Sequence, residues 1–221
     1  DPEMSADPEV AMAASFKVIE YAMKLSALHK DNPKDDIIGA LLRGTQREEG
    51  LSEEEFVWFF LMLIAAGNES TRTVISHGLL QLMQHPEQLQ YLVDNPDKIP
   101  KACEERLRYN TAFIIMRRTA MEDAQVGGQQ LKKGDKIIMH YHTVNHDESI
   151  FGDDAMAFDV TRAERMPDLY NQHRAFGVGQ HFCLGTHLAR LEMRVMFEEI
   201  IPRIRNPKLV GDVAYTRSNL V

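Results

Sequence analysis

The longest uninterrupted helical pattern in the chain runs from Ser52 to His85 and ends at Pro86. It opens with a capping box, because Ser52 is followed three residues later by Glu55 and then by an apolar run. At 1.5 Å per residue such a helix is about 50 Å long. Apolar residues cover most of its faces near the middle, so we expect it to be buried. The rest of the chain must fold around this one helix.

Shorter helices are expected on both sides of the long one. Apolar residues recur at helical spacing from Val10 to His29, and Asp35 or Asp36 can cap a short helix through Leu42. Three more helical segments are predicted between Pro86 and Pro96, over Ile99 to Tyr109, and over Leu184 to Ile201.

Two runs rich in β-forming residues, Phe113 to Met116 and Lys136 to His140, are separated by turn signals that include Gly127-Gly128. Residues 144–182 show little periodicity, and a loop of that length inside a compact domain usually has a function. We therefore expect a mainly α-helical fold with small β-sheets and one long structured loop, in a single domain over residues 1–221.

Charge and cysteine content narrow the class of protein. A formal net charge of −8 argues against nucleic acid or an anionic membrane as a partner. The two cysteines imply no disulfide framework, and reduced thiols are typical of the cytoplasm. The acidic start at Asp1 and Glu3 does not resemble a signal peptide, and the apolar stretch from Phe56 to Ala66 is too short to span a bilayer. We expect a soluble, cytoplasmic protein.

The strongest chemical signal is the segment from Phe176 to Gly185, which reads Phe-Gly-Val-Gly-Gln-His-Phe-Cys-Leu-Gly. Three glycines just before a helix predict a turn where the backbone approaches another group closely. Cys183 stands at the start of that helix, where the macrodipole favours a thiolate, and a thiolate is a good ligand for iron. Taken alone, a cysteine beside such a turn is more often a small buried core residue.

The whole segment resembles the haem-binding loop of the cytochrome P-450 family, and the resemblance extends over essentially the entire chain. It implies haem b as cofactor, with Cys183 as the ligand of the iron. It also implies the carboxy-terminal, haem-binding half of that fold, built on a long central helix. The loop residues that it assigns to haem binding are Phe176, Gly177, Gly179, His181, Cys183 and Gly185.

A pair of charges upstream of the loop fits the same family. Glu105 and Arg108 lie three residues apart and therefore share one face of a helix. On its own this is a common surface pair. The resemblance implies that it ties the helix to the long loop, around Phe158 to Arg165, through charge-assisted hydrogen bonds.

The long helix carries the sequence Ala66-Gly67-Asn68-Glu69-Ser70-Thr71. A glycine inside a helix costs roughly 1 kcal/mol relative to alanine, so Gly67 needs a reason. The resemblance implies a groove above the haem at Ala66 and Gly67, where dioxygen binds. It also implies an acid–alcohol pair that directs protons there, formed by Glu69 and Ser70 with Thr71 beside them. The family's usual alcohol is threonine, whereas this chain has Ser70 at that position. A polar patch on the surface of a helix is the simpler alternative for these residues.

Other residues are assigned by the resemblance to the haem carboxylates and to the substrate. Arg118, His173 and His181 match donors to the two carboxylates, although each alone would more often be a surface residue. A zinc site at His181, Cys183 and His187 lacks a second pair of ligands. The apolar residues implied to line the substrate pocket are Met62, Ala65, Phe113, Ile114 and Ile115.

The activity implied is that of a monooxygenase, which inserts one atom of O₂ into a hydrophobic molecule of sterol, terpene or alkyl-chain type. Electrons would come from a ferredoxin-like or flavin partner, for which Arg190 and Arg194 offer a basic face. Family members are nearly twice this length, so we expect Phe59, Phe60 and their apolar neighbours to be exposed and to favour self-association. Two alternatives stay open: a haem-binding fragment or pseudoenzyme without turnover, and a peroxide-driven haem enzyme.

Overall fold

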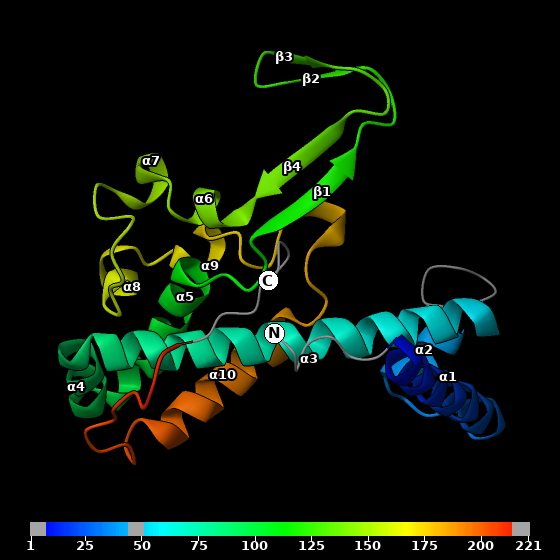
Figure 1. Ribbon diagram of the computed structural model, residues 1–221, viewed down its shortest axis with the longest axis horizontal. Coiled ribbons are helices and arrows are strands. Elements are labelled where there is room, and N and C mark those ends of the chain that lie inside the picture. The colour runs from blue at the N-terminus through cyan, green and yellow to red at the C-terminus, as the bar shows by residue number, and fades with distance from the viewer. Residues whose placement is uncertain (1–7, 44–50, 214–221) are drawn as a thin grey trace. The chain divides into compact units, whose positions relative to one another are not determined.

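The computed structural model describes residues 8–43 and 51–213 (Figure 1). It contains two compact units, Asp1–Asn68 and Glu69–Val221, and the boundary between them falls inside the long helix α3 (Glu53–Gln84). Each unit is described by itself. The acidic start at Asp1 and Glu3 lies outside the described residues.

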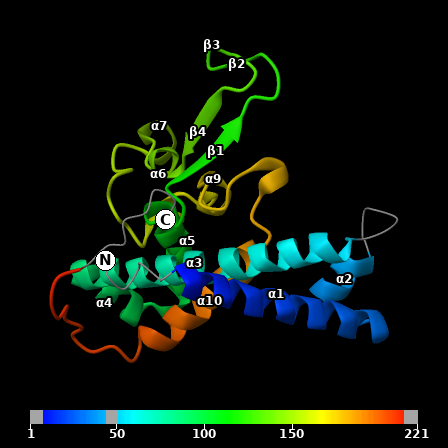
Figure 2. The ribbon, with the colours of Figure 1, turned by 45° about the vertical axis from the view of Figure 1, so that its right-hand side comes forward.

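The first unit is built from α1 (Pro8–Asp31), α2 (Ile37–Arg43) and the first half of α3 (Figure 2). The expected cap of α2 is present, because the Asp36 carboxylate accepts a hydrogen bond from the amide of Gly39 at 2.8 Å. The capping box of α3 is also confirmed. The Glu55 amide donates to Ser52 Oγ at 3.2 Å, and the Ser52 amide donates to Glu55 Oε2 at 2.9 Å.

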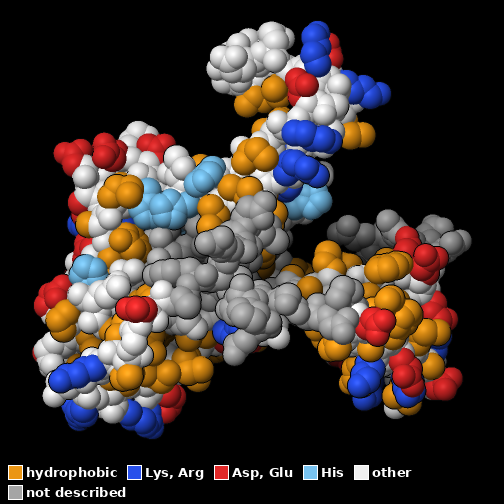
Figure 3. Space-filling view, in the orientation of Figure 1, with side chains coloured by type: hydrophobic (Ala, Val, Ile, Leu, Met, Phe, Trp, Pro, Cys, Tyr) orange, Lys and Arg blue, Asp and Glu red, His pale blue; other side chains and the backbone are white. Residues whose placement is uncertain are grey.

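The prediction that the middle of α3 is buried is wrong for the described residues. Met62 is 54% exposed and Ile64 is 49% exposed, and Figure 3 shows apolar side chains on the surface of this unit. The small core of the unit centres on Ala22, Phe56 and Val57, and the apolar residues packed on it extend along α3 only to Leu61. The helix is therefore covered by α1 and α2 over its first turns only.

Phe59 and Phe60 are half-buried, in contrast to their expected exposure. Phe60 stacks on Phe56 and lies against Tyr21, with ring centroids 6.0 Å apart in both pairs. The exposed apolar residues of this helix are instead Trp58, Met62 and Ile64.

The main core belongs to the second unit. It joins the second half of α3 to α4 (Pro86–Asp94), α5 (Ile99–Tyr109) and α10 (Thr186–Ile200), and the short helix η1 (Pro96–Lys98) connects α4 to α5. The helices approach closely at Gly78, where an added Cβ would lie 2.8 Å from Arg106 Cδ and 3.1 Å from Phe197 Cζ. Cys103 is buried in this core.

Two small antiparallel sheets are found among the described residues. Strand β1 (Ile115–Thr119) pairs with β4 (Lys136–His140), and β2 (Ala124–Val126) pairs with β3 (Gln129–Leu131). The first strand starts two residues later than predicted, because Phe113 packs against the helical core. The fold is thus mainly α-helical with small sheets, as the sequence predicts.

The segment between the sheets and α10 is not one continuous loop. It contains short helices α6 (Tyr141–Asn145), α7 (Glu148–Phe151), α8 (Arg162–Arg165), α9 (Leu169–Gln172) and η2 (Gly179–His181). A second, small core is buried within it, at Phe151, Ala155, Ala163 and Leu169. These elements carry the residues of the candidate site.

Candidate functional site

The glycine-rich segment forms the tight turn that its sequence predicts. Gly177 and Gly179 have φ values of +73° and +74°, a region that is strained for residues with a side chain. The amide of Cys183 donates to the carbonyl of Phe176 at 3.0 Å, which closes the turn. The amide of Thr186, the first residue of α10, lies 3.4 Å from the Cys183 carbonyl. Cys183 therefore lies three residues before Thr186, the first residue of a fifteen-residue helix.

The surroundings of Cys183 fit a metal ligand. Its side chain is half-buried and not paired in a disulfide. Within the described part of the chain, the amides of Leu184 and Gly185 donate to no acceptor. A Cβ at Gly185 would lie 3.9 Å from the Cys183 sulfur. The exposed apolar side chains of Phe182 and Leu184 suit a flat apolar group such as a porphyrin.

Glu105 and Arg108 form a fully buried, bidentate ion pair on α5. Arg108 Nε and Nη2 lie 2.7 and 2.8 Å from the two carboxylate oxygens. The remaining guanidinium hydrogens are also used, since Arg108 donates to the carbonyls of Asn145, Ala155 and Ala157 at 2.7–2.9 Å. The pair thus ties α5 to the irregular segment.

A third buried charge, Arg162, completes this network and was not identified from the sequence. Its Nε lies 3.1 Å from Glu105 Oε2, and its Nη1 lies 3.1 Å from Asp154 Oδ1. The backbone amide of Asp159 also donates to Glu105, at 3.0 Å. The sequence signal for this contact is an arginine within an irregular stretch rich in aspartate. A buried arginine requires a carboxylate partner, so such a stretch favours a buried ion pair.

A second charge cluster forms around Glu104, a residue for which the sequence predicted no role. Arg190 donates to Glu104 from Nε and Nη2, at 2.9–3.2 Å. His173 Nε2 lies 2.9 Å from Glu104 Oε2. Burial works to raise the pKa of Glu104, but the hydrogen bonds and charges of His173 and Arg190 outweigh it and hold this pKa below its usual value.

This cluster changes the interpretation of two predicted residues. The other ring nitrogen of His173 accepts from the Ala175 amide at 3.3 Å, so both of its nitrogens are engaged within the described residues, and its assignment to a haem carboxylate stays a prediction. Arg190 is largely buried against Glu104 and is not part of an open basic face. Arg194 is exposed and lies 3.7 Å from Glu198 on the same helix.

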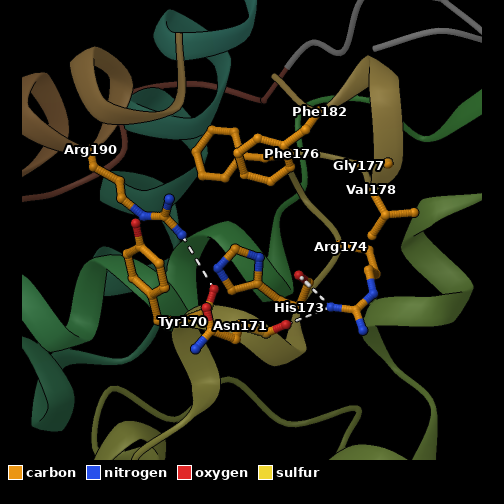
Figure 4. Close-up of a pocket in the computed structure, with 10 residues that line it drawn as sticks. Tyr170, Asn171, His173, Arg174, Phe176, Gly177, Val178, Phe182 and Arg190 are labelled. Atoms are coloured by element: carbon orange, nitrogen blue, oxygen red, sulfur yellow. Dashed lines mark hydrogen bonds between the residues drawn. The ribbon is translucent and has the colours of Figure 1, made fainter. Parts of the chain in front are cut away.

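A pocket of about 400 Å³ lies beside the cysteine loop (Figure 4). Its polar lining includes the side chains of His173, Arg174 and Arg190, and its apolar lining includes Phe176 and Phe182. Figure 4 shows Tyr170 and the aromatic loop residues around the guanidinium of Arg190. The Arg174 guanidinium is engaged with the backbone, at 2.6 Å from the Asn171 carbonyl.

The remaining predicted residues of the second unit lie on separate elements. Glu69 is exposed on α3 and pairs with Arg72 at 2.5 Å, while Ser70 and Thr71 are half-buried next to it. Arg118 is exposed on β1, and His181 is exposed in η2. The apolar residues Phe113, Ile114 and Ile115 are half-buried where α5 leads into β1.

Four predicted residues, namely Met62, Ala65, Ala66 and Gly67, belong to the first unit and are exposed there. Beyond its own helix backbone, an added Cβ at Gly67 would find no heavy atom of the described residues within 4 Å. Packing within the described chain therefore does not explain this glycine. The substrate-lining and oxygen-groove assignments stay predictions.

Comparisons with known proteins agree with this geometry. Residues 99–205 match the family model of cytochrome P-450. A steroid C26-monooxygenase of Mycolicibacterium smegmatis is 38% identical over 96% of this chain and 47% of its own length. Linalool 8-monooxygenase of Pseudomonas putida is 35% identical over 100% of this chain and 53% of its own length.

Solved structures show the same relationship. CYP109E1 of Bacillus megaterium, in complex with testosterone, superimposes with a TM-score of 0.78 and 33% identity. The match covers 88% of this chain and 52% of that one. This chain belongs to the cytochrome P-450 family, and it spans about half the length of the curated relatives that it matches.

Proposed function

We propose that the chain binds haem b through Cys183 and forms part of a monooxygenase that acts on hydrophobic small molecules. The observation that carries the proposal is the placement of Cys183, which a glycine-rich turn holds three residues before α10, beside two amides that have no acceptor among the described residues. The names of the relatives support it, because they are monooxygenases of a steroid and of linalool.

Different residues of the chain would bind the iron and the two carboxylates of haem. Cys183 would bind as the anionic ligand, and the amides of Leu184 and Gly185 are free to donate to its sulfur and tune it. Arg118 and His181, which are both exposed, would hold the two carboxylates. When bound, haem supplies the redox centre at which dioxygen is activated.

Proton delivery is proposed for Glu69 and Ser70. The Glu69 carboxylate is exposed beside Arg72 and can exchange protons with solvent. From Glu69 Oε a proton would pass to the hydroxyl of Ser70 or of Thr71, and that hydroxyl would release its own proton towards the oxygen site; both residues follow Glu69 on the same helix. Ala66 and Gly67, one turn earlier, would border the oxygen site.

The substrate proposed is a sterol, terpene or alkyl-chain compound. Met62, Ala65, Phe113, Ile114 and Ile115 would contribute an apolar lining. A ferredoxin-like or flavin protein in the cytoplasm would supply electrons. The helices of the described residues include none with the length and apolar character needed to cross a bilayer.

One spectrum tests the ligand. After haem is added and reduced under carbon monoxide, the chain is expected to give the strongly red-shifted Soret band of a thiolate ligand. Cys183→Ala should abolish that band, whereas Cys103→Ala, at a buried position in the core, should keep it. A Cys183→Ala chain that retains the band would refute the assignment.

A haem-binding chain without turnover is the second candidate. It is favoured by the exposed apolar residues of α3. Haem-loaded chain would be supplied with electrons, dioxygen and an alkyl substrate. Product formation supports the monooxygenase, and a thiolate band without product supports the second candidate. Product obtained only with hydrogen peroxide indicates a peroxide-driven enzyme.

A further inference from the structure

Three segments that are distant in sequence meet at the carboxylate of Glu104. Arg190 on α10 contacts both of its oxygens, through Nε at 2.9 and 3.2 Å and Nη2 at 3.0 Å. His173, which follows α9, approaches the same carboxylate at 2.9 Å. A carboxylate only accepts, so His173 Nε2 carries a proton, and His173 Nδ1 lies 3.3 Å from the amide of Ala175.

The guanidinium of Arg190 is also held on its faces and at its remaining edge. Its central carbon lies 3.7 Å from the Tyr170 ring centroid and 4.6 Å from that of Phe176 (Figure 4). Its Nη1 donates to Thr186 Oγ1 at 2.6 Å. Few orientations satisfy all of these contacts together, and a flat guanidinium meets them where an ammonium group would not.

Arg190 contacts residues that lie before and after Cys183 in the sequence, and both of these residues are hydrogen-bonded to the backbone of Cys183. On one side, the Phe176 ring lies against Arg190 and the Phe176 carbonyl accepts the amide of Cys183 at 3.0 Å. On the other side, Thr186 binds Arg190 through its hydroxyl, and its amide lies 3.4 Å from the Cys183 carbonyl. Glu104 fixes Arg190, and Arg190 therefore fixes both flanks of the cysteine.

We propose that Glu104 and Arg190 are positioning residues, which keep the Cys183 loop in its ligand-ready conformation before any cofactor binds. The nature of the ligand rests on the proposed function, but the order of the loop does not. A loop that is already ordered loses less conformational entropy when its cysteine binds a metal. Arg190 thereby acts inside the chain rather than on a partner surface.

The test measures the order of the loop in the full chain without haem. The rate at which iodoacetamide alkylates Cys183 is followed by peptide mass spectrometry, so that buried Cys103 is counted separately. Glu104→Gln removes the charge that holds Arg190, and we expect alkylation of Cys183 to accelerate about tenfold or more. Glu198→Gln is the matched control, because Glu198 pairs with Arg194 on the exposed side of α10, and its rate should be unchanged.

Arg190→Lys is the second variant, and it decides the matter if Glu104→Gln does not fold. It keeps a positive charge for Glu104 but loses the flat stacking on Phe176, so we expect a smaller, several-fold acceleration. Arg194→Lys is its control. A rate at Cys183 equal to that of the controls in a folded variant would overturn the proposal. So would an acceleration at Cys103 equal to that at Cys183, because that pattern indicates general destabilisation.

Haem addition then separates this inference from the proposed function. At equal haem occupancy, the Glu104→Gln chain should show a smaller share of the thiolate-type band with carbon monoxide than the unaltered chain. If the unaltered chain gives no such band, the haem proposal fails, while the alkylation rates still stand as the test of positioning. If the band is normal in both chains and the rates are equal, positioning fails and haem ligation stands.

Discussion

Individual side chains in this protein take their chemical character from a few nearby backbone groups. Cys183 lies three residues before the first residue of α10, and Gly177 and Gly179 supply the left-handed backbone conformations of the turn that precedes it. Sequence alone identified these residues because glycine freedom and helix ends are local effects. His173 shows the limit, because its partner Glu104 is 69 positions away.

Glu69 allows a prediction for one exposed carboxylate. Glu69→Gln cannot pass a proton, so with haem bound we expect turnover about tenfold or more slower while the thiolate band is kept. Product formation and the carbon monoxide spectrum are measured on the same sample. Glu54→Gln is the control, because Glu54 is exposed in the first turn of α3, and this variant should turn over normally. Equal rates for both variants would remove Glu69 from the mechanism.

His146 allows a prediction of pH dependence. Its ring stacks on His142 at 4.2 Å, and burial lowers the pKa of both histidines below 6.5. The unfolded chain therefore binds more protons in the window just below pH 6.5. The contribution of His146 to stability is full above that pH and is lost as the pH falls through the folded-state pKa.

Urea unfolding measured at about pH 7.5 and about pH 5.5 checks this window. The chain should be less stable at the lower pH, and His146→Gln should reduce the difference. His187→Gln, at an exposed histidine, should leave the difference unchanged. A difference that His146→Gln does not alter would show that other groups cause the acid sensitivity.

Helices of the second unit are joined by a charge network and by one close contact. Arg108 lies fully buried between Glu105 and three carbonyls, so Arg108→Ala leaves a buried carboxylate short of a partner. We expect a loss of about 3–5 kcal/mol in the free energy of unfolding. Arg194→Ala, which removes an exposed pair, should cost at most about 1 kcal/mol. Urea unfolding of both variants compares them, and similar losses would contradict the network's role.

For two glycines of α3, we predict that substitution by alanine changes the stability in opposite directions. Gly78→Ala would force a methyl group to 2.8 Å from Arg106 and should lower stability by about 1–3 kcal/mol. Gly67→Ala meets no atom of the described residues beyond its own helix and should raise stability by about 1 kcal/mol. Thermal unfolding of the two variants measures this contrast. A loss of stability at Gly67→Ala would show that this position is crowded in the folded chain.

For the whole molecule, the informative feature is the number of apolar side chains left exposed in the first unit. Phe16, Tyr21 and Leu28 on α1 are 60–64% exposed, and Trp58 on α3 is 62% exposed. Apolar residues gathered in this way favour association. We predict that the apparent mass rises with protein concentration. Light scattering after gel filtration measures it, and a monodisperse monomer at high concentration would contradict the prediction.

Secondary structure was largely readable from the residue order. The ends of α1, α3 and α5 were predicted closely, because caps, prolines and helical spacing act within a turn or two. The hairpin of β2 and β3 was not predicted, because three-residue strands leave little pattern. Burial of the middle of α3 was predicted wrongly, because an apolar helix face does not specify which segment covers it.

The residue order by itself determined the family, the glycine-rich turn and the position of Cys183 at a helix start, since each depends on neighbours in the chain. Only the tertiary structure decided which buried charges pair across long distances in the sequence. Glu105 meets Arg162 across 57 positions, and Glu104 meets Arg190 across 86. A charge has no preferred partner in sequence, and it acquires one only when packing removes both groups from water.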